Sequence, residues 1–115
     1  MILIVGGLAC GKRAYVQSEY SFSLQDMADA VLDDKPVLYN LQDLIARDQG
    51  SAAALLPQLA QKQIVICNEI GCGIVPASYA DRNYRETVGR VCVELARRAE
   101  KVIRICSGIP AVLKG

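Results

Sequence analysis

The chain begins with a short run of branched apolar residues that glycine interrupts, and this junction constrains the fold more than any other feature. Residues 2–5 read ILIV, residues 6 and 7 are both glycine, and another glycine precedes a lysine at residues 11 and 12. A β-branched run bounded by glycine is typical of a buried parallel strand. Residues 12–20 contain neither glycine nor proline and are expected to form a helix. The glycines therefore lie at a strand-to-helix turn.

The pattern G-x-x-x-x-G-K at such a turn predicts a loop that binds the phosphates of a nucleotide. Glycine lets the backbone approach a ligand closely, so successive N–H groups converge on an anion at the N-terminus of the following helix. Lys12 is expected to reach the β- and γ-phosphates as a point charge. A plain glycine turn into a helix is the alternative. The predicted nucleotide-binding residues are Gly6, Gly7, Leu8, Ala9, Cys10, Gly11, Lys12 and Arg13.

The residue after the lysine departs from the usual phosphate-loop pattern. That position usually holds Ser or Thr, whose hydroxyl binds Mg²⁺, whereas this chain has Arg13. An arginine can neutralise phosphate charge directly. It does not orient the leaving group as a metal ion does. The sequence therefore implies Mg²⁺ as a cofactor and at the same time removes one of its usual ligands.

Length and composition favour one globular domain. The chain has 115 residues, of which 52% are hydrophobic and 22% charged. We therefore expect residues 1–115 to form a single nucleotide-binding domain. The net charge of +1 gives no electrostatic case for binding nucleic acid or an anionic membrane. No apolar run approaches the ~18 residues of a membrane span, and no signal peptide is evident, so a cytoplasmic location is expected.

The chain has five cysteines and no histidine, which argues against a zinc site. None of the cysteines forms a C-x-x-C pair, and reduced, buried thiols are the simplest interpretation. Cys10 is the exception, because it lies within the predicted phosphate loop.

Apolar periodicity predicts that strands alternate with helices along the rest of the chain. Ser23 is expected to cap an amphipathic helix whose apolar residues recur from Leu24 to Leu32, with Asp26 as a weak capping partner. Residues 111–115 are expected to be a short tail. The order predicts an α/β fold with a mostly parallel sheet of about four strands, whose carboxyl ends bind ligands. The other expected strands cover residues 36–40, 63–67 and 101–106, and the other expected helices residues 41–45, 51–61 and 78–100.

Four segments carry a resemblance to a known family. They are GGLACGK at residues 6–12, NEIGCGIVP at 68–76, the helix at 79–102 and SGIPAVLK at 107–114, and the second is the most specific. Together they resemble the adenosylcobinamide kinase / adenosylcobinamide-phosphate guanylyltransferase family of cobalamin biosynthesis. The likeness is weak between residues 15 and 62. It implies a P-loop NTPase-like three-layer sandwich.

The resemblance also implies an activity. Members of this family phosphorylate the aminopropanol hydroxyl of adenosylcobinamide with a nucleoside triphosphate, and then transfer GMP to that phosphate through a guanylylated histidine. ATP or GTP as a substrate, a corrinoid small molecule as the acceptor and assembly into a homo-oligomer are therefore implied. This chain has no histidine, and it is shorter than typical members in the region before Val37. We therefore expect the guanylyltransferase step to be absent.

Two further positions bear on catalysis. Residues 37–40 align with a family strand that ends in aspartate, whereas Asn40 is neutral and a poorer partner for Mg²⁺. Glu69 is the remaining carboxylate in a motif loop. It is expected to hold the metal ion or to orient the acceptor hydroxyl, with capping of backbone N–H groups as the alternative. Lys12 and Glu69 are thus the predicted catalytic residues. The residues expected in loops near the substrate are Asn40, Asn68, Gly71, Gly73, Pro76, Gly108 and Pro110.

Three functions stay open on the sequence. The first is an enzyme, a reduced adenosylcobinamide kinase in which Lys12 holds the triphosphate and Glu69 lies near the acceptor. The second is a non-catalytic member of the same family that binds nucleotide or a corrinoid as a regulator or a subunit. The third is a kinase for another small alcohol.

Overall fold

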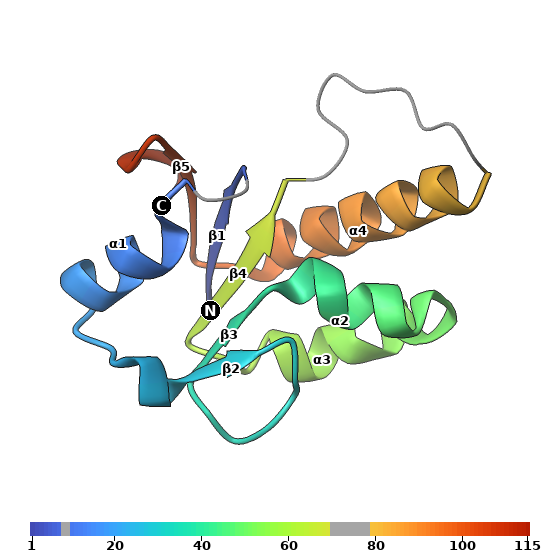
Figure 1. Cartoon of the computed structure of the whole chain (residues 1–115), viewed down its shortest axis with the longest axis horizontal. Coiled ribbons are helices and arrows are strands. Elements are labelled where there is room, and N and C mark those ends of the chain that lie inside the picture. The colour runs from blue at the N-terminus through green and yellow to red at the C-terminus, as the bar shows by residue number, and fades with distance from the viewer. Residues whose placement is uncertain (8–9, 70–78) are drawn as a thin grey trace.

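The structure, a computed structural model, describes residues 1–7, 10–69 and 79–115. Over these residues it is a three-layer α/β sandwich with one six-stranded sheet between helices (Figure 1). The strands are β1 (Ile2–Gly6), β2 (Met27–Asp29), β3 (Val37–Tyr39), β4 (Ile64–Asn68), β5 (Lys101–Cys106) and β6 (Ile109–Lys114). The helices are α1 (Lys12–Glu19), α2 (Leu41–Arg47), α3 (Leu56–Leu59) and α4 (Tyr79–Arg98), with 3-10 turns η1 (Leu24–Asp26) and η2 (Gln49–Leu55).

The first strand lies in the middle of the sheet, whose order is β2-β3-β4-β1-β5-β6. Ile2 of β1 is in parallel register with Ile64 of β4 on one side and with Lys101 of β5 on the other. β2, β3 and β4 are parallel to one another, and only β6 is antiparallel among the strands described. The predicted α/β fold with a mostly parallel sheet is therefore confirmed, although the sheet has six strands rather than about four.

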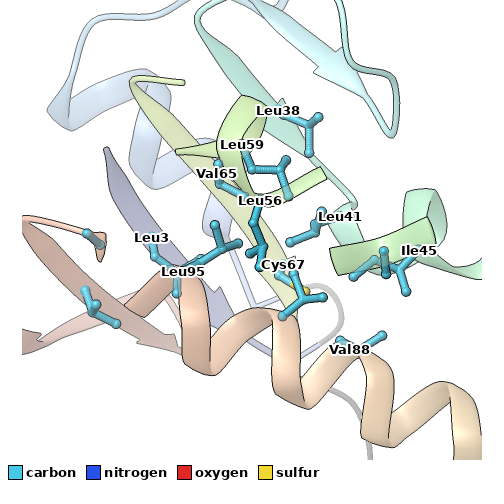
Figure 2. Close-up of a cluster of buried hydrophobic side chains, with 14 residues drawn as sticks. Leu3, Leu38, Leu41, Ile45, Leu56, Leu59, Val65, Cys67, Val88 and Leu95 are labelled. Carbon is cyan, nitrogen blue, oxygen red and sulfur yellow. The ribbon is translucent and has the colours of Figure 1, made fainter. Parts of the chain in front are cut away.

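Alternate side chains of β1 enter two separate cores. Leu3 packs in the core that α2, α3 and α4 cover (Figure 2), and Ile4 packs in the core on the side of α1, beside Val16. Both β1 side chains are at most 1% exposed. Successive strand residues point to opposite faces of a sheet, so a central strand covered by helices on both faces needs apolar residues at every position. The run ILIV meets that requirement.

The amphipathic helix predicted after Ser23 is wrong. The chain makes only the short turn η1 and then enters β2, where Met27 is buried and pairs with β3. The capping partner is correct, since the Ser23 N–H donates to Asp26 Oδ2 at 2.9 Å. Leu24 and Val31, which the helical pattern places on the apolar face, are both exposed. Backbone pairing with β3 therefore outweighs a local periodicity whose apolar face has little to pack against.

The predicted C-terminal tail is also wrong, because the chain continues into β6 and forms a hairpin with β5. Ser107 and Gly108 are the two turn residues, with φ of 50° and 76°. Positive φ at both positions is typical of a type I′ turn, whose twist matches that of paired strands. Pro110 is tolerated in β6 because this is an edge strand. A Ser-Gly pair between two apolar runs is the sequence signal for such a hairpin.

The other predicted elements are confirmed to within two residues at each end, with one exception. The helix predicted over residues 51–61 is found as η2 followed by the four-residue α3. Pro57 lies at the start of α3, where its missing N–H leaves no hydrogen bond unmade. Within residues 1–7, 10–69 and 79–115, no helix combines the length and the apolar character that crossing a membrane requires.

Candidate functional site

A cavity of about 560 Å³ opens at the edge of the sheet where the parallel strands end. The turn after β1, the first half of α1 and the ends of β3 and β4 surround it. Ligands of open α/β sheets bind at this edge. The lining residues are Cys10, Gly11, Lys12, Arg13, Ala14, Gln17, Leu24, Tyr39, Asn40, Ile66 and Asn68.

Both glycines that define the G-x-x-x-x-G pattern are required by the backbone at this turn. Gly11 immediately precedes α1 and has φ of 94°, a conformation that favours glycine. Gly6 ends β1, and a methyl group placed on it would lie 2.5 Å from the Ile105 carbonyl oxygen and 2.6 Å from Cys10 Sγ. Neither position accommodates a side chain without rearrangement. The pattern therefore specifies the shape of the loop on steric grounds.

Lys12 is the first residue of α1 and lines the cavity, although it is only 8% exposed. Its Nζ donates to the Gly7 carbonyl oxygen at 2.6 Å and lies 3.7 Å from Cys10 Sγ. A buried ammonium group needs polar partners, and these partners fold the side chain back over the loop. A phosphate oxygen is a stronger partner than a neutral carbonyl. The two contacts hold the ammonium group of Lys12 beside the cavity.

The hairpin turn between β5 and β6 supports the loop. The Gly108 N–H donates to the Cys10 carbonyl oxygen at 2.9 Å, and a Cβ on Gly11 would lie 3.6 Å from Gly108 Cα. Of the two residues that the sequence places near substrate in this segment, Gly108 therefore holds the loop in place. Pro110 pairs with Ile105 within the hairpin and does not line the cavity.

Arg13 is the second residue of α1 and lies over an aromatic ring. Its Cζ is 4.9 Å from the centroid of the Tyr39 ring, a cation–π distance. Both residues line the cavity. Tyr39 is not among the site residues predicted from the sequence. Tyr39 is the last residue of the parallel strand β3, and this position at the ligand-binding edge of the sheet is the signal that could have indicated it.

Asn40 also lines the cavity, and a chain of hydrogen bonds fixes its side chain. Its Nδ2 donates to Asp29 Oδ1 at 2.8 Å, and its Oδ1 accepts a bond from Gln42 Nε2 at 3.3 Å. Gln42 is only 4% exposed, and its Oε1 accepts the Asn68 backbone N–H at 3.0 Å. These three hydrogen bonds connect the ends of β2, β3 and β4. Sequence reasoning found Asn40 and Asn68 but missed Asp29 and Gln42.

Glu69 follows β4 and forms a two-point ion pair with Arg104 of β5. Glu69 Oε1 is 2.8 Å from Arg104 Nε, and Glu69 Oε2 is 3.0 Å from Nη2. The Glu69 backbone N–H donates to the Gly6 carbonyl oxygen at 2.7 Å. Bidentate pairing is the strong form of an arginine–carboxylate contact. The carboxylate that the sequence assigns to a metal ion or to the acceptor hydroxyl is therefore engaged by an arginine.

The side chains present do not fit Mg²⁺ in the way a phosphate loop usually holds it. The hydroxyl position is Arg13, the strand-end position is the neutral Asn40, and the Glu69 carboxylate is paired with Arg104. In the part of the chain that the structure describes, no three His, Cys, Asp or Glu side chains cluster to form a metal site. Mg²⁺ prefers several carboxylate, hydroxyl or water oxygens in octahedral geometry. Charge at this site comes from arginine and lysine instead.

The four described cysteines are free thiols in different surroundings. Cys67 is buried, and a hydrogen bond to Cys92 together with burial raises its pKa well above the ordinary value. The same hydrogen bond lowers the pKa of Cys92. Cys10 is half-buried beside the cavity, whereas Cys106 is exposed, so the prediction of buried thiols is wrong for Cys106.

Some predicted site residues lie outside the described part of the chain, and their roles stay predictions. These residues are Leu8, Ala9, Gly71, Gly73 and Pro76.

Comparison with known proteins supports the resemblance. A model of the cobinamide kinase / cobinamide phosphate guanyltransferase family, CobU, matches residues 23–113. The bifunctional adenosylcobalamin biosynthesis protein CobU of Escherichia coli (strain K12) is 34% identical over 74 residues, which are 64% of this chain and 41% of that protein. The protein of the same name from Salmonella typhimurium is 40% identical over 53 residues, 46% of this chain and 29% of the relative. The bifunctional protein CobP of Pseudomonas aeruginosa is 35% identical over 72 residues, 60% of this chain and 42% of the relative.

The matched part of the chain covers less than half the length of each of these relatives. The glycine-rich loop at residues 6–12 precedes the residues that the family model matches, so the match does not bear on the role of this loop. The family model nevertheless extends over most of the sequence, from β2 to β6. The chain belongs to the cobinamide kinase / cobinamide phosphate guanyltransferase family.

Proposed function

We propose that this protein transfers the γ-phosphate of ATP or GTP to the hydroxyl of adenosylcobinamide. The observation that carries the proposal is Lys12, which lies at the start of α1, lines the cavity and bonds only neutral partners, Gly7 and Cys10, among the described residues. A triphosphate in the cavity offers oxygens that bind the ammonium more strongly than a carbonyl does. Membership of the family makes a corrinoid alcohol the acceptor to test first.

The proposed reaction is a single displacement at phosphorus. The acceptor hydroxyl oxygen forms a bond to the γ-phosphorus, the bond from that phosphorus to the β-phosphate oxygen breaks, and the hydroxyl proton leaves to solvent. The products are a phosphate ester and a nucleoside diphosphate. Positioning and charge stabilisation account for most of such catalysis. Lys12, the loop N–H groups and the N-terminus of α1 supply positive charge where the phosphate oxygens lie.

We propose further that the guanylyltransferase step is not performed by these 115 residues. In the resembling enzymes a histidine carries the nucleotide, and this sequence contains none. The expected product is therefore the phosphate ester itself, with no GMP attached.

Location and assembly belong to the same proposal. A cytoplasmic protein meets the nucleoside triphosphates that it needs. A homo-oligomer is supported by β6, an edge strand with exposed apolar side chains, because such strands tend to pair with another chain. The mass in solution by light scattering tests the assembly. The exposed apolar side chains are Ile109, Val112 and Leu113.

The test measures transfer of label from γ-labelled ATP or GTP to adenosylcobinamide, with and without Mg²⁺. The wild-type protein, the Lys12→Ala variant and a Lys114→Ala control are compared, because Lys114 lies on β6 and does not line the cavity. We expect labelled phosphate ester from the wild type and the control and none from Lys12→Ala. Equal transfer by Lys12→Ala contradicts the proposal.

A second candidate is a non-catalytic member of the family that binds nucleotide or a corrinoid as a regulator or a subunit. The ion pair between Glu69 and Arg104 favours it, because the carboxylate assigned to catalysis is already engaged. Binding of nucleotide with no transfer to adenosylcobinamide or to another small alcohol identifies this function. Transfer to another small alcohol alone identifies a kinase with a different acceptor.

A further inference from the structure

We propose that Arg13, presented by the Tyr39 ring, neutralises the triphosphate in place of a divalent cation, so that this protein binds nucleotide without Mg²⁺. The inference rests on the nucleotide site of the proposed function, and it holds whether or not phosphate is then transferred.

Arg13 is the second residue of α1, adjacent to Lys12, and both side chains line the same cavity. In the usual phosphate loop the hydroxyl at this position places a metal ion against the phosphates. A guanidinium group there carries its positive charge to the same region and can form two parallel hydrogen bonds to phosphate oxygens.

Arg13 contacts the Tyr39 ring, and its charge is not neutralised by a carboxylate of the described residues. Its Cζ lies 4.9 Å from the centroid of the Tyr39 ring, and within the described residues no carboxylate forms an ion pair with it. Stacking on a ring restricts the long side chain and leaves the edge of the guanidinium, with its N–H donors, available. A group that is ordered before binding loses less entropy when it meets its ligand.

The other two positions expected to bind a metal ion, Asn40 and Glu69, already bond protein side chains. Asn40 donates to Asp29 and accepts from Gln42, so both ends of its amide are used. Glu69 meets Arg104 at two points. A divalent cation at this site would have to displace these partners. Arg13 and Lys12 give the phosphates two cations that require no displacement of an ion pair.

The experiment titrates fluorescently labelled ATP into the full chain in excess EDTA and, separately, in excess Mg²⁺. We expect dissociation constants that agree to within about twofold for the wild type. In EDTA the Arg13→Ala variant should bind about tenfold more weakly, the loss of one charge-assisted contact. Arg13→Lys keeps the charge without the planar fork and should fall between the two.

Three further variants make the test specific. Tyr39→Phe keeps the ring and should bind like the wild type, whereas Tyr39→Leu removes it and should bind more weakly, by less than Arg13→Ala. Arg90→Ala is the control for loss of one positive charge, because Arg90 is an exposed residue of α4 that pairs with Glu86.

The possible results distinguish failure of the role inferred for Arg13 from failure of the proposed nucleotide-binding function. Binding that needs Mg²⁺, or an Arg13→Ala variant that binds like the wild type in EDTA, overturns the inference and leaves the nucleotide site intact. Binding that is absent in both solutions overturns the proposed function and the inference together. Loss of binding in the Lys12→Ala variant in both solutions supports the nucleotide site alone.

Discussion

The carboxylate of Glu69 and the guanidinium of Arg104 meet across the end of β1, with Glu69 Oε1 2.8 Å from Arg104 Nε. Glu69 directly follows β4 and Arg104 lies in β5, and these two strands flank β1 in the sheet. The pair therefore connects both neighbours of the central strand at the edge where the cavity lies.

A double-mutant cycle over Glu69→Gln and Arg104→Leu should give a coupling of about 0.5 kcal/mol in the free energy of unfolding. The value is modest because the Arg104 side chain is 52% exposed and solvent screens the charges. Urea denaturation of the wild type, both single variants and the double variant measures it. The cycle cancels the other contacts of each residue. A coupling of zero at low salt, or one that grows as salt is added, contradicts a stabilising ion pair.

Gly6→Ala should destabilise the protein by about 1–3 kcal/mol. The added methyl group would lie 2.5 Å from the carbonyl oxygen of Ile105, a backbone atom that cannot move without disturbing the pairing of β1 with β5. Gly7→Ala is the matched control, because a methyl group there would meet no atom of the described residues within 4 Å, and it should change stability by less than about 0.5 kcal/mol. Equal unfolding midpoints in denaturant for the two variants would show that the close approach of Gly6 to the Ile105 carbonyl oxygen does not exclude a methyl group.

Bound nucleotide should protect Cys10 from alkylation. Cys10 lines the cavity and its sulfur lies 3.7 Å from Lys12 Nζ, whereas Cys106 is exposed and is not one of the lining residues. Iodoacetamide followed by peptide mass spectrometry measures both sites in one sample. Modification of Cys10 should slow in the presence of ATP, while Cys106 should react at an unchanged rate. Parallel slowing at both sites would indicate a global effect instead.

Stability at high pH should depend on Tyr84. Burial, with the charge of Asp43, raises the pKa of Tyr84 from 10.0 to about 12 in the folded protein. Because the pKa of Tyr84 is raised in the folded protein, the folded state binds the phenol proton more tightly than the unfolded state does. The resulting stabilisation is complete below pH 10 and is lost as the pH rises toward 12. The stability difference between wild type and Tyr84→Phe should therefore shrink over that range in urea titrations. A difference that stays constant from pH 8 to 12 would exclude this linkage.

The strands with strong local signals were predictable from sequence, and those set by long-range pairing were not. The β-branched residues of β1 and the glycines after them predict a strand. Met27 in β2 carries no such signal, because a three-residue strand is defined only by the neighbour with which it pairs. The hairpin of β5 and β6 has a sequence signal in Ser107 and Gly108, yet the apolar residues after them are expected to form a tail and instead form β6.

The candidate site shows the same division. The loop residues that end at Lys12 follow from a contiguous pattern. Tyr39 and Gln42 do not, because the first acts through Arg13 and the second through the Asn68 backbone, each about 26 residues away in sequence. Such contacts exist only once the sheet has brought β3 and β4 beside α1. Tyr39 carries one local hint, its place as the last residue of β3, whereas Gln42 lies within α2 and carries none of this kind.

The pairing of β1 has a consequence for how the protein is made. The strand β1 can form its backbone hydrogen bonds only after the segments around Ile64 and Lys101 have been synthesised. The carbonyl of Cys10 likewise gains its hydrogen bond only when Gly108 is present. During synthesis the glycine-rich loop emerges before β5 and the hairpin turn that support it. Long-range pairing of this kind slows folding and leaves an apolar strand exposed in the meantime. The strand β1 therefore completes its pairing only after β5 has been synthesised, and a ligand that binds the folded cavity would stabilise the folded protein rather than these early intermediates.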